Sequence, residues 1–275
     1  MLGKCRTAVV PTKGGFTATF TKAFFGKIWE GFERFDGNNV WTDGTNIYYS
    51  VVSDNYVLNG GSWEEISFNE KIIGGCIWTD GTNIYHSNAN GGSANGQYVL
   101  NGDAWEKKAW SGLTIFYGYD VWTDGTNIYY GDYVLNGDTW VKKTWNGSIL
   151  YPRGDYVWTD GTNIYYSNGS SHHVLNGDTW GEKEWNGMPA FSGQNVWTDG
   201  TNIYHSGGSS HHVLNGDTWE VVEFDGLPSF YGADIWTDGT NIYYSTSGEQ
   251  GILIPTTARL YRRANGVWVK SATIG

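Results

Sequence analysis

The chain has 275 residues and is rich in glycine (40), tryptophan (16) and tyrosine (19). Its net charge is −11, and its 17 lysines and arginines are scattered, which argues against a nucleic-acid partner and against an acidic membrane surface. No apolar run approaches the ~18 residues of a membrane span, and the N-terminus lacks the apolar core of a secretory signal. We expect a cytoplasmic or virion protein without membrane insertion.

The first predicted element is an N-terminal hairpin within residues 1–37, with strands at 17–25 and 27–37. The second of these strands resembles residues 218–226 further along the chain. Six repeats follow it. Each begins with the string Trp-Thr-Asp-Gly-Thr-Asn-Ile-Tyr, at Trp41, Trp78, Trp122, Trp158, Trp197 and Trp236. A second string, containing Asn-Gly, ends at Trp63, Trp105, Trp140, Trp180, Trp219 and Trp268.

Each repeat predicts two hairpins. In the third repeat the strands are 121–123, 128–130, 133–135 and 139–145, called strands A to D below. Asp-Gly and Asn-Gly, which tolerate positive φ, stand at the A–B and C–D turns. Four strands in ~40 residues, repeated six times, is the period of a propeller blade.

The predicted fold is therefore all-β, a six-bladed β-propeller of four-stranded antiparallel blades in one domain, 1–275. The blades begin near residues 38, 75, 119, 155, 194 and 233. Residues 260–273 are predicted to be the C–D hairpin of the last blade. We expect the N-terminal hairpin to close the ring on that blade, beside Tyr243 or outside Trp268, because an open ring leaves unpaired strand edges.

The order Ile164-Tyr165-Tyr166-Ser167, followed by the string from His173 to Trp180, resembles the Kelch repeat. The resemblance covers about residues 28–270, although the Gly-Gly pair typical of Kelch after strand B is mostly missing. It implies a propeller that binds peptides at the mouth of its channel. The Trp-Thr-Asp string is also similar to the Tyr-Trp-Thr-Asp propellers of lipoprotein receptors. The near-identical repeats resemble propellers of bacteriophage structural proteins.

Both hairpin turns are almost constant among the repeats, whereas the B–C and D–A connections vary. These connections should share one face, which we call the variable face, and specificity normally lies on such loops. Four residues before each strand-A Trp stands a glycine, which predicts positive φ or very close packing. The residues around it differ between repeats. The candidate ligand-binding residues are Tyr117, Tyr119, Asp120, Arg153, Asp155, Tyr156, Gln194, Asn195, Tyr231 and Asp234, with Tyr151 as a further exposed ring.

Several tempting features have plainer explanations. The Asp of each Asp-Gly turn is typical of a turn that bonds its own backbone, and calcium is the alternative. The repeat tryptophans favour packing between blades over a sugar platform. His172-His173 and His211-His212 cannot chelate a metal as pairs, because adjacent strand residues point to opposite faces. Phe116, Phe191 and Phe230 recur at one position, which favours buried caps. Cys5 and Cys76 predict neither a disulfide framework nor a metal site.

We therefore predict a non-catalytic binding propeller that recognises a glycan or a protein on its variable face, with no cofactor and no metal. A phage structural or host-recognition component is one setting for it. One alternative is a glycan-cleaving enzyme that uses mouth carboxylates such as Asp120, Asp155 and Asp234. Another is a cytoplasmic scaffold of Kelch type.

Overall fold

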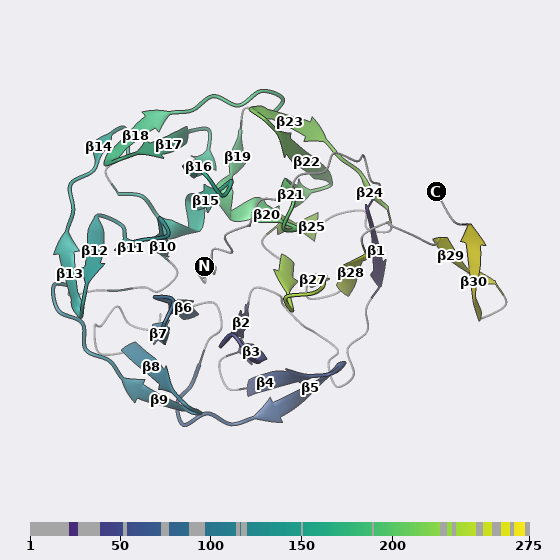
Figure 1. Cartoon of the computed structure of the whole chain (residues 1–275), viewed down its shortest axis with the longest axis horizontal. Coiled ribbons are helices and arrows are strands. Elements are labelled where there is room, and N and C mark those ends of the chain that lie inside the picture. Colours follow the sequence, from purple (N-terminus) through teal and green to yellow (C-terminus); the bar gives the residue numbers. More distant parts are fainter. Residues whose placement is uncertain are drawn as a thin grey trace.

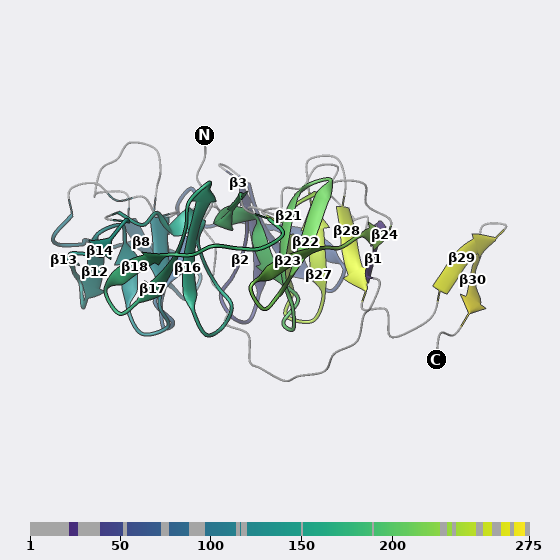
Figure 2. The ribbon, with the colours of Figure 1, turned by 90° about the horizontal axis from the view of Figure 1, so that it is seen from above.

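The structure is a computed structural model that describes residues 22–26, 39–51, 54–72, 77–87, 97–113, 116, 120–149, 151–188, 190–225, 230–232, 235–245, 250–254, 260–264 and 267–272. Six antiparallel four-stranded blades stand around a central axis (Figure 1). Seen from the side, the blades form one flat layer (Figure 2). The predicted fold class, an all-β six-bladed propeller, is confirmed.

The first three blades follow the predicted order of four strands, each strand paired with the next. Blade one is β2 (Val40–Thr42), β3 (Ile47–Val51), β4 (Asp54–Asn59) and β5 (Ser62–Ile66). Blade two is β6 (Ile77–Thr79), β7 (Ile84–Ser87), β8 (Gln97–Asn101) and β9 (Ala104–Lys107). Blade three is β10 (Val121–Thr123), β11 (Ile128–Tyr130), β12 (Tyr133–Asn136) and β13 (Thr139–Lys142).

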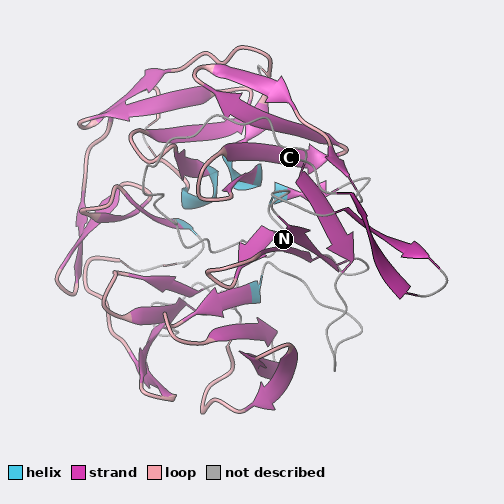
Figure 3. Cartoon of the chain, turned by 45° about the vertical axis from the view of Figure 1, so that its right-hand side comes forward, coloured by secondary structure: helices cyan, strands magenta, loops and turns pink. Residues whose placement is uncertain are grey.

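Blades four and five repeat this order and are preceded by short 3₁₀ turns, which Figure 3 draws in cyan near the axis. Blade four is β15 (Val157–Thr159), β16 (Ile164–Gly169), β17 (His172–Asn176) and β18 (Thr179–Glu182), after η4 (Gly154–Tyr156). Blade five is β20 (Val196–Thr198), β21 (Ile203–Gly208), β22 (Ser210–Asn215) and β23 (Thr218–Val221), after η5 (Gly193–Asn195).

Blade six takes its outer strand from the N-terminal end of the chain. Its strands are β26 (Ile235–Thr237), β27 (Ile242–Ser245), β28 (Gln250–Ile254) and β1 (Lys22–Gly26). The N-terminal strand does pair with the last blade, but both predicted positions for it, beside Tyr243 and outside Trp268, are wrong. It lies antiparallel to β28, with Phe24 opposite Leu253. Most of the remaining predicted hairpin, 1–21 and 27–37, lies outside the described residues.

The C-terminal hairpin was predicted to be the outer half of blade six, and that prediction is wrong. β29 (Leu260–Ala264) and β30 (Val267–Ala272) pair with each other and with no other described strand. In blade six Leu253 is buried in the core that blades five and six share. By register, Arg263 of the hairpin would stand in that place, because it pairs with Trp268 as Leu253 pairs with Phe24. Burying an unpaired arginine there would be costly, so the apolar β28 takes the place.

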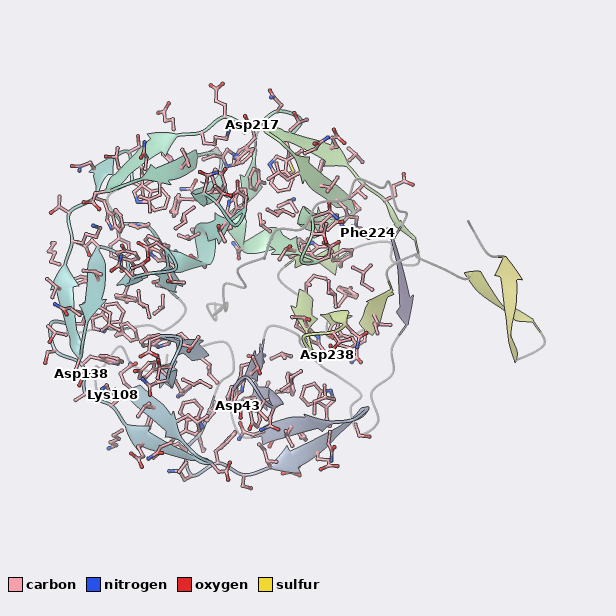
Figure 4. All side chains as sticks on the ribbon, viewed as in Figure 1. Asp43, Lys108, Asp138, Asp217, Phe224 and Asp238 are labelled. Atoms are coloured by element: carbon pink, nitrogen blue, oxygen red, sulfur yellow. The ribbon has the colours of Figure 1, made fainter. Side chains whose placement is uncertain are left out.

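The constant A–B turn is held by its own side chains, which confirms the prediction of a turn that bonds its own backbone. In blade one, Asp43 Oδ1 accepts hydrogen bonds from the backbone N–H groups of Thr45 and Asn46, at 2.8 and 2.6 Å. Its Oδ2 accepts from the Tyr48 hydroxyl at 2.8 Å. Burial opposes ionisation of the Asp43 carboxyl, but the hydrogen bonds from these donors outweigh burial and lower the pKa of Asp43. Burial and the hydrogen bond to Asp43 raise the pKa of Tyr48 to about 12. Asp43 and Asp238 mark two of these turns in Figure 4.

Tryptophans fill the junctions between blades, as predicted. Between blades three and four, Trp122 stacks on Tyr129 and lies within 6 Å of both Trp145 and Trp180, ring centroid to ring centroid. Equivalent sets occupy the junctions on either side: Trp78, Trp110 and Trp140, and Trp158, Trp185 and Trp219. Trp63 of blade one meets Trp236 of blade six at 6.0 Å, so the aromatic packing continues across the closing junction.

Among the described residues, the segment that leaves an outer strand lies along the outer strand of the next blade. β14 (Asn146–Gly147) pairs with β18, and β24 (Phe224–Asp225) pairs with β1, both in parallel. A lysine of each of three such segments adds an ion pair to the next blade: Lys108–Asp138, Lys143–Asp178 and Lys183–Asp217. Lys108 and Asp138 lie together at the rim in Figure 4. These contacts cover strand edges that would otherwise be open to other chains.

Candidate functional site

In three of the D–A connections the structure describes a glycine that packs against the preceding blade. A Cβ on Gly154 would lie 2.5 Å from the Asp120 carbonyl oxygen, and one on Gly232 would lie 2.0 Å from that of Asn195. Gly193 approaches the Tyr156 carbonyl in the same way, at 2.3 Å. None of these three glycines has a positive φ. Of the two predicted explanations, close packing is therefore correct at these positions.

This close approach brings together four of the predicted site residues, which we call the Arg153 cluster: Asp120, Arg153, Asp155 and Tyr156. Asp120 directly precedes β10 of blade three, whereas the other three begin blade four at η4. Arg153 Nε lies 3.5 Å from Asp120 Oδ1, and Arg153 Nη2 donates to Asp155 Oδ2 at 3.3 Å. The guanidinium carbon lies 5.4 Å from the centre of the Tyr156 ring. One cation thus joins two carboxylates on neighbouring blades.

The cluster combines buried carboxylates with an accessible cation. The Asp120 and Asp155 side chains are 9% and 11% exposed, whereas the Arg153 side chain is 45% exposed. Burial raises the pKa of Asp120 to about 6; Arg153 opposes this rise and Asp155 adds to it. Burial also disfavours the charged form of Arg153, yet the two carboxylates raise its pKa overall. Arg153 is therefore held charged and fixed in direction, with part of its surface open to a ligand.

Tyr151 belongs beside this cluster. Its ring is exposed and covers Gly131, where a Cβ would lie 2.3 Å from ring atom Cε2. Burial of its hydroxyl and the Asp120 charge raise the pKa of Tyr151. The two-residue B–C connection of blade three, Gly131 and Asp132, leaves room for this ring. The sequence contains that short connection, which is the signal that could have placed Tyr151 in the site.

The remaining predicted site residues divide into two groups. Gln194 and Asn195 lie in η5, half-buried, immediately beside Tyr156 because Gly193 packs on its carbonyl. Tyr231 is exposed in β25 (Phe230–Tyr231), a short strand that pairs with β21. Tyr117, Tyr119 and Asp234 lie outside the described residues. The phenylalanines predicted to be caps, Phe116, Phe191 and Phe230, are all buried, which confirms that assignment.

The histidines pack as aromatic rings. His172 stacks on Phe191 at 4.4 Å between ring centroids, and His211 stacks on Phe230 at 4.3 Å. Burial lowers the pKa of His211 to about 4, and that of His86 likewise to about 4. Within the described part of the chain, no three His, Cys, Asp or Glu side chains are placed to share a metal ion.

Asp120 predicts a pH-dependent stability. Its pKa when folded, about 6, lies above the ordinary aspartate value of 3.8, so the folded protein holds this proton more tightly than the unfolded chain. Its contribution is therefore favourable below about pH 4 and is lost as pH rises through about 6. We expect Asp120→Asn to gain about 2 kcal/mol relative to wild type between pH 4 and pH 7. Urea unfolding at both pH values measures this change, and a difference that is the same at both would contradict it.

Neither a protein-family model nor a curated protein sequence matches this chain. Among solved structures, the extracellular domain of a hybrid two-component system of B. thetaiotaomicron aligns with 14% identity and a TM-score of 0.51. The alignment covers 87% of this chain and 41% of that one, so the chain spans about two-fifths of its neighbour's length. A second structure, titled as a one-component system of the same organism, aligns with a TM-score of 0.50, 14% identity and coverages of 88% and 41%.

A streptogramin B lyase also aligns, with 10% identity and a TM-score of 0.43, over 86% of this chain and 98% of that one. At 14% identity, the two B. thetaiotaomicron structures show a likeness of fold alone. None of the helices in the described residues has the length and apolarity to cross a bilayer.

Proposed function

We propose that the chain is a non-catalytic binding propeller whose variable face binds a glycan at the Arg153 cluster. The observation that carries this proposal is the half-exposed Arg153, fixed between two buried carboxylates over the Tyr156 ring. A guanidinium held in this way donates hydrogen bonds to ligand oxygens without losing much side-chain freedom on binding. The buried carboxylates accept hydrogen bonds from hydroxyl groups, which a glycan presents in number.

Two exposed aromatic residues add to the argument for a glycan: Tyr151 beside the cluster, and Tyr231 in the connection between blades five and six. Among the described residues, Tyr151 and Tyr231 are the aromatic members of the set of exposed large hydrophobic side chains. Exposed tyrosines give a binding surface at low entropic cost, since few side-chain torsions are fixed on binding. The net charge of −11 favours a neutral glycan over an acidic one.

A surface glycan would suit more than one biological setting. The phage-like repeats favour a host-recognition component of a virion, and the Kelch-like order favours a propeller that works as a binding module. The two solved neighbours with TM-scores of 0.51 and 0.50 named above are extracellular domains of a hybrid two-component system and a one-component system of B. thetaiotaomicron.

A glycan array tests the proposal with purified protein. We expect Arg153→Ala to weaken binding to the glycan that wild type selects by about tenfold or more, the loss of a hydrogen bond from a charged donor. Tyr231→Ala should weaken it less. Val221→Ala, also at an exposed position but on the outer strand β23, is the matched control and should leave affinity unchanged. The melting temperatures of Tyr231→Ala and Val221→Ala should stay near wild type because these side chains are exposed. Arg153→Ala should melt lower, because it leaves the carboxylates of Asp120 and Asp155 without their cation, so its binding is measured well below its melting temperature.

The glycan selected by the array also distinguishes binding from the competing function, which is glycan cleavage. The raised pKa of Asp120 beside Asp155 would suit an acid and a base of a glycan-cleaving enzyme. Cleavage of the bound glycan, followed by mass spectrometry and abolished in Asp120→Asn, would overturn the non-catalytic proposal. Unchanged binding in Arg153→Ala would remove the cluster from the site.

A further inference from the structure

A hollow lies at the junction of blades one and two, away from the Arg153 cluster. It has a volume of about 230 Å³ and is lined by Asn55, Glu65, Ile66, Ser67, Phe68, Asn69, Glu70 and Lys71. A buried water needs only about 15 Å³ by a comparable measure, so this hollow can hold a molecule of monosaccharide size. Its lining comes from β4, β5 and the segment that follows β5.

Asn55 is the unusual residue of this hollow. It is 6% exposed, and no donor in the described residues bonds its Oδ1. A buried acceptor without a donor is unfavourable by about 1–3 kcal/mol, so native proteins rarely keep one without a purpose. A ligand that supplies an N–H or O–H group would satisfy it.

The equivalent positions of other blades also hold buried polar side chains, some of them with unsatisfied atoms, so Asn55 differs from them in the hollow that lies beside it. Strand pairing places Gln97, His172 and His211 at the same register, each opposite the serine that ends strand B. Gln97 accepts a hydrogen bond from Ser87 at 2.6 Å. The two histidines stack on Phe191 and Phe230.

The hollow exists because its D–A connection is short and lacks a covering ring. Five residues lie between Phe68 and Gly74, whereas seven lie between Trp110 and Gly118 and between Trp185 and Gly193. Ile72 stands where Phe191 and Phe230 stand in later blades. Ile72 is fully buried and supplies no ring of the kind that Phe191 and Phe230 stack on His172 and His211.

Neighbouring side chains set the chemistry of the ligand. The carboxylates of Glu65 and Glu70 and the Asn55 Oδ1 accept hydrogen bonds, and Lys71 is the cation of the lining. The pKa of Tyr98 is raised mainly by burial, and the charge of Glu70 and a hydrogen bond to it raise this pKa further. Asn69 is already used, since it exchanges hydrogen bonds with the Trp105 backbone at 2.9 and 2.8 Å and so holds this wall in place. Acceptors with a net negative charge favour a neutral or cationic molecule rich in donors.

We propose that the Asn55 hollow is a binding site for a single polyhydroxylated molecule of hexose size, separate from the site at the Arg153 cluster. The ligand donates an O–H or N–H to Asn55 Oδ1 and further hydroxyls to Glu65 and Glu70. The half-buried Phe68 offers an apolar wall to the ring carbons.

Titration of ¹⁵N-labelled full-length protein with D-glucose and with D-glucosamine, followed by NMR, tests this site. We expect saturable shifts confined to residues 54–72 with both sugars, and tighter, salt-sensitive binding of glucosamine, because the lining is acidic. Asn55→Leu should weaken both by about tenfold or more, with an unchanged or higher melting temperature since the unpaired acceptor is gone. Ser67→Tyr, which blocks the hollow from its exposed side, should have the same effect on binding.

The control variant is Arg153→Ala, which should leave these shifts intact. This result separates failure of the present inference from failure of the proposed glycan site, because each site has its own variant. The inference is overturned if neither sugar gives saturable shifts at residues 54–72, or if Asn55→Leu binds as wild type does. It is equally overturned if Arg153→Ala abolishes the shifts, since the sugar would then occupy the other site.

Discussion

Replacing Gly187 by alanine is expected to lower the free energy of unfolding by about 3 kcal/mol. Gly187 has a φ of +81°, and a Cβ on it would lie 2.2 Å from the Trp219 carbonyl oxygen of the next blade. The added methyl group would push this segment away from β23 and strain the backbone hydrogen bonds that Asn186 forms with Asp217 and Trp219. It would also disturb Trp185, which is buried between the two blades. Equilibrium unfolding in guanidinium measures the loss.

Two other glycines separate the causes of this effect. Gly216 has a φ of +58° but open space around it, so Gly216→Ala should cost about 1 kcal/mol through backbone strain alone. Gly181 has neither a positive φ nor a neighbour within 4 Å, and Gly181→Ala should change stability by less than about 0.5 kcal/mol. If Gly187→Ala lost no more stability than Gly216→Ala, the close approach of neighbouring blades would not contribute to holding the ring.

The fold was predictable because every repeat contains sequence signals for its own strands and turns. Asp-Gly and Asn-Gly specify the two turns, and the stacked pair of Trp122 and Tyr129 recurs with each copy at spacings that only paired strands allow. The serine that ends strand B is one detail that the repeats contain and the prediction did not use. It accepts the hydrogen bond of the strand-A indole, as Ser50 does from Trp41 at 3.0 Å, and so satisfies a buried donor.

For the candidate site, the sequence predicted which positions could contribute but not which side chains would lie in contact. Equivalent places in the D–A connections identified Asp120 and Arg153, but they belong to different blades. Their meeting depends on how closely Gly154 approaches the Asp120 carbonyl. The Asn55 hollow was missed for a related reason. The shorter connection after Phe68 is visible in the sequence, whereas the lack of a donor for Asn55 depends on the three-dimensional surroundings.

Ring closure was the least predictable feature, because the closing strand does not resemble the repeats. β1 has Phe24 at the register of the strand-D tryptophan, and the chain that carries it contains no Asn-Gly turn before it. The C-terminal hairpin keeps the repeat spacing from Tyr261 to Trp268 and even its pairing, with Tyr261 opposite Lys270 as Tyr133 is opposite Lys142. Resemblance to the repeats therefore predicted the wrong segment. The apolar strand β28 forms the third strand of blade six, and β1 pairs with it as the fourth.

Deleting residues 1–26 is accordingly expected to lower the melting temperature by at least about 10 °C and to cause self-association. β1 pairs with β28 on one edge and with β24 on the other, so its loss leaves β24 without this partner and opens one edge of β28, which stays paired with β27. Leu253 and Phe224, both buried in the core between blades five and six, would lose cover. Thermal unfolding and light scattering after size-exclusion chromatography measure both effects.

The matched control deletes residues 258–275, which removes the C-terminal hairpin. Because β29 and β30 pair only with each other among the described strands, this deletion should shift the melting temperature by less than about 2 °C. A synthetic peptide of residues 15–32 should restore the melting temperature of the N-terminal deletion by adding the missing strand. The same peptide with Phe24→Pro should fail, because β1 is paired on both edges and proline removes one of the hydrogen bonds between strands. If the C-terminal deletion were the more harmful of the two, β29 and β30 would have to form the outer half of blade six after all.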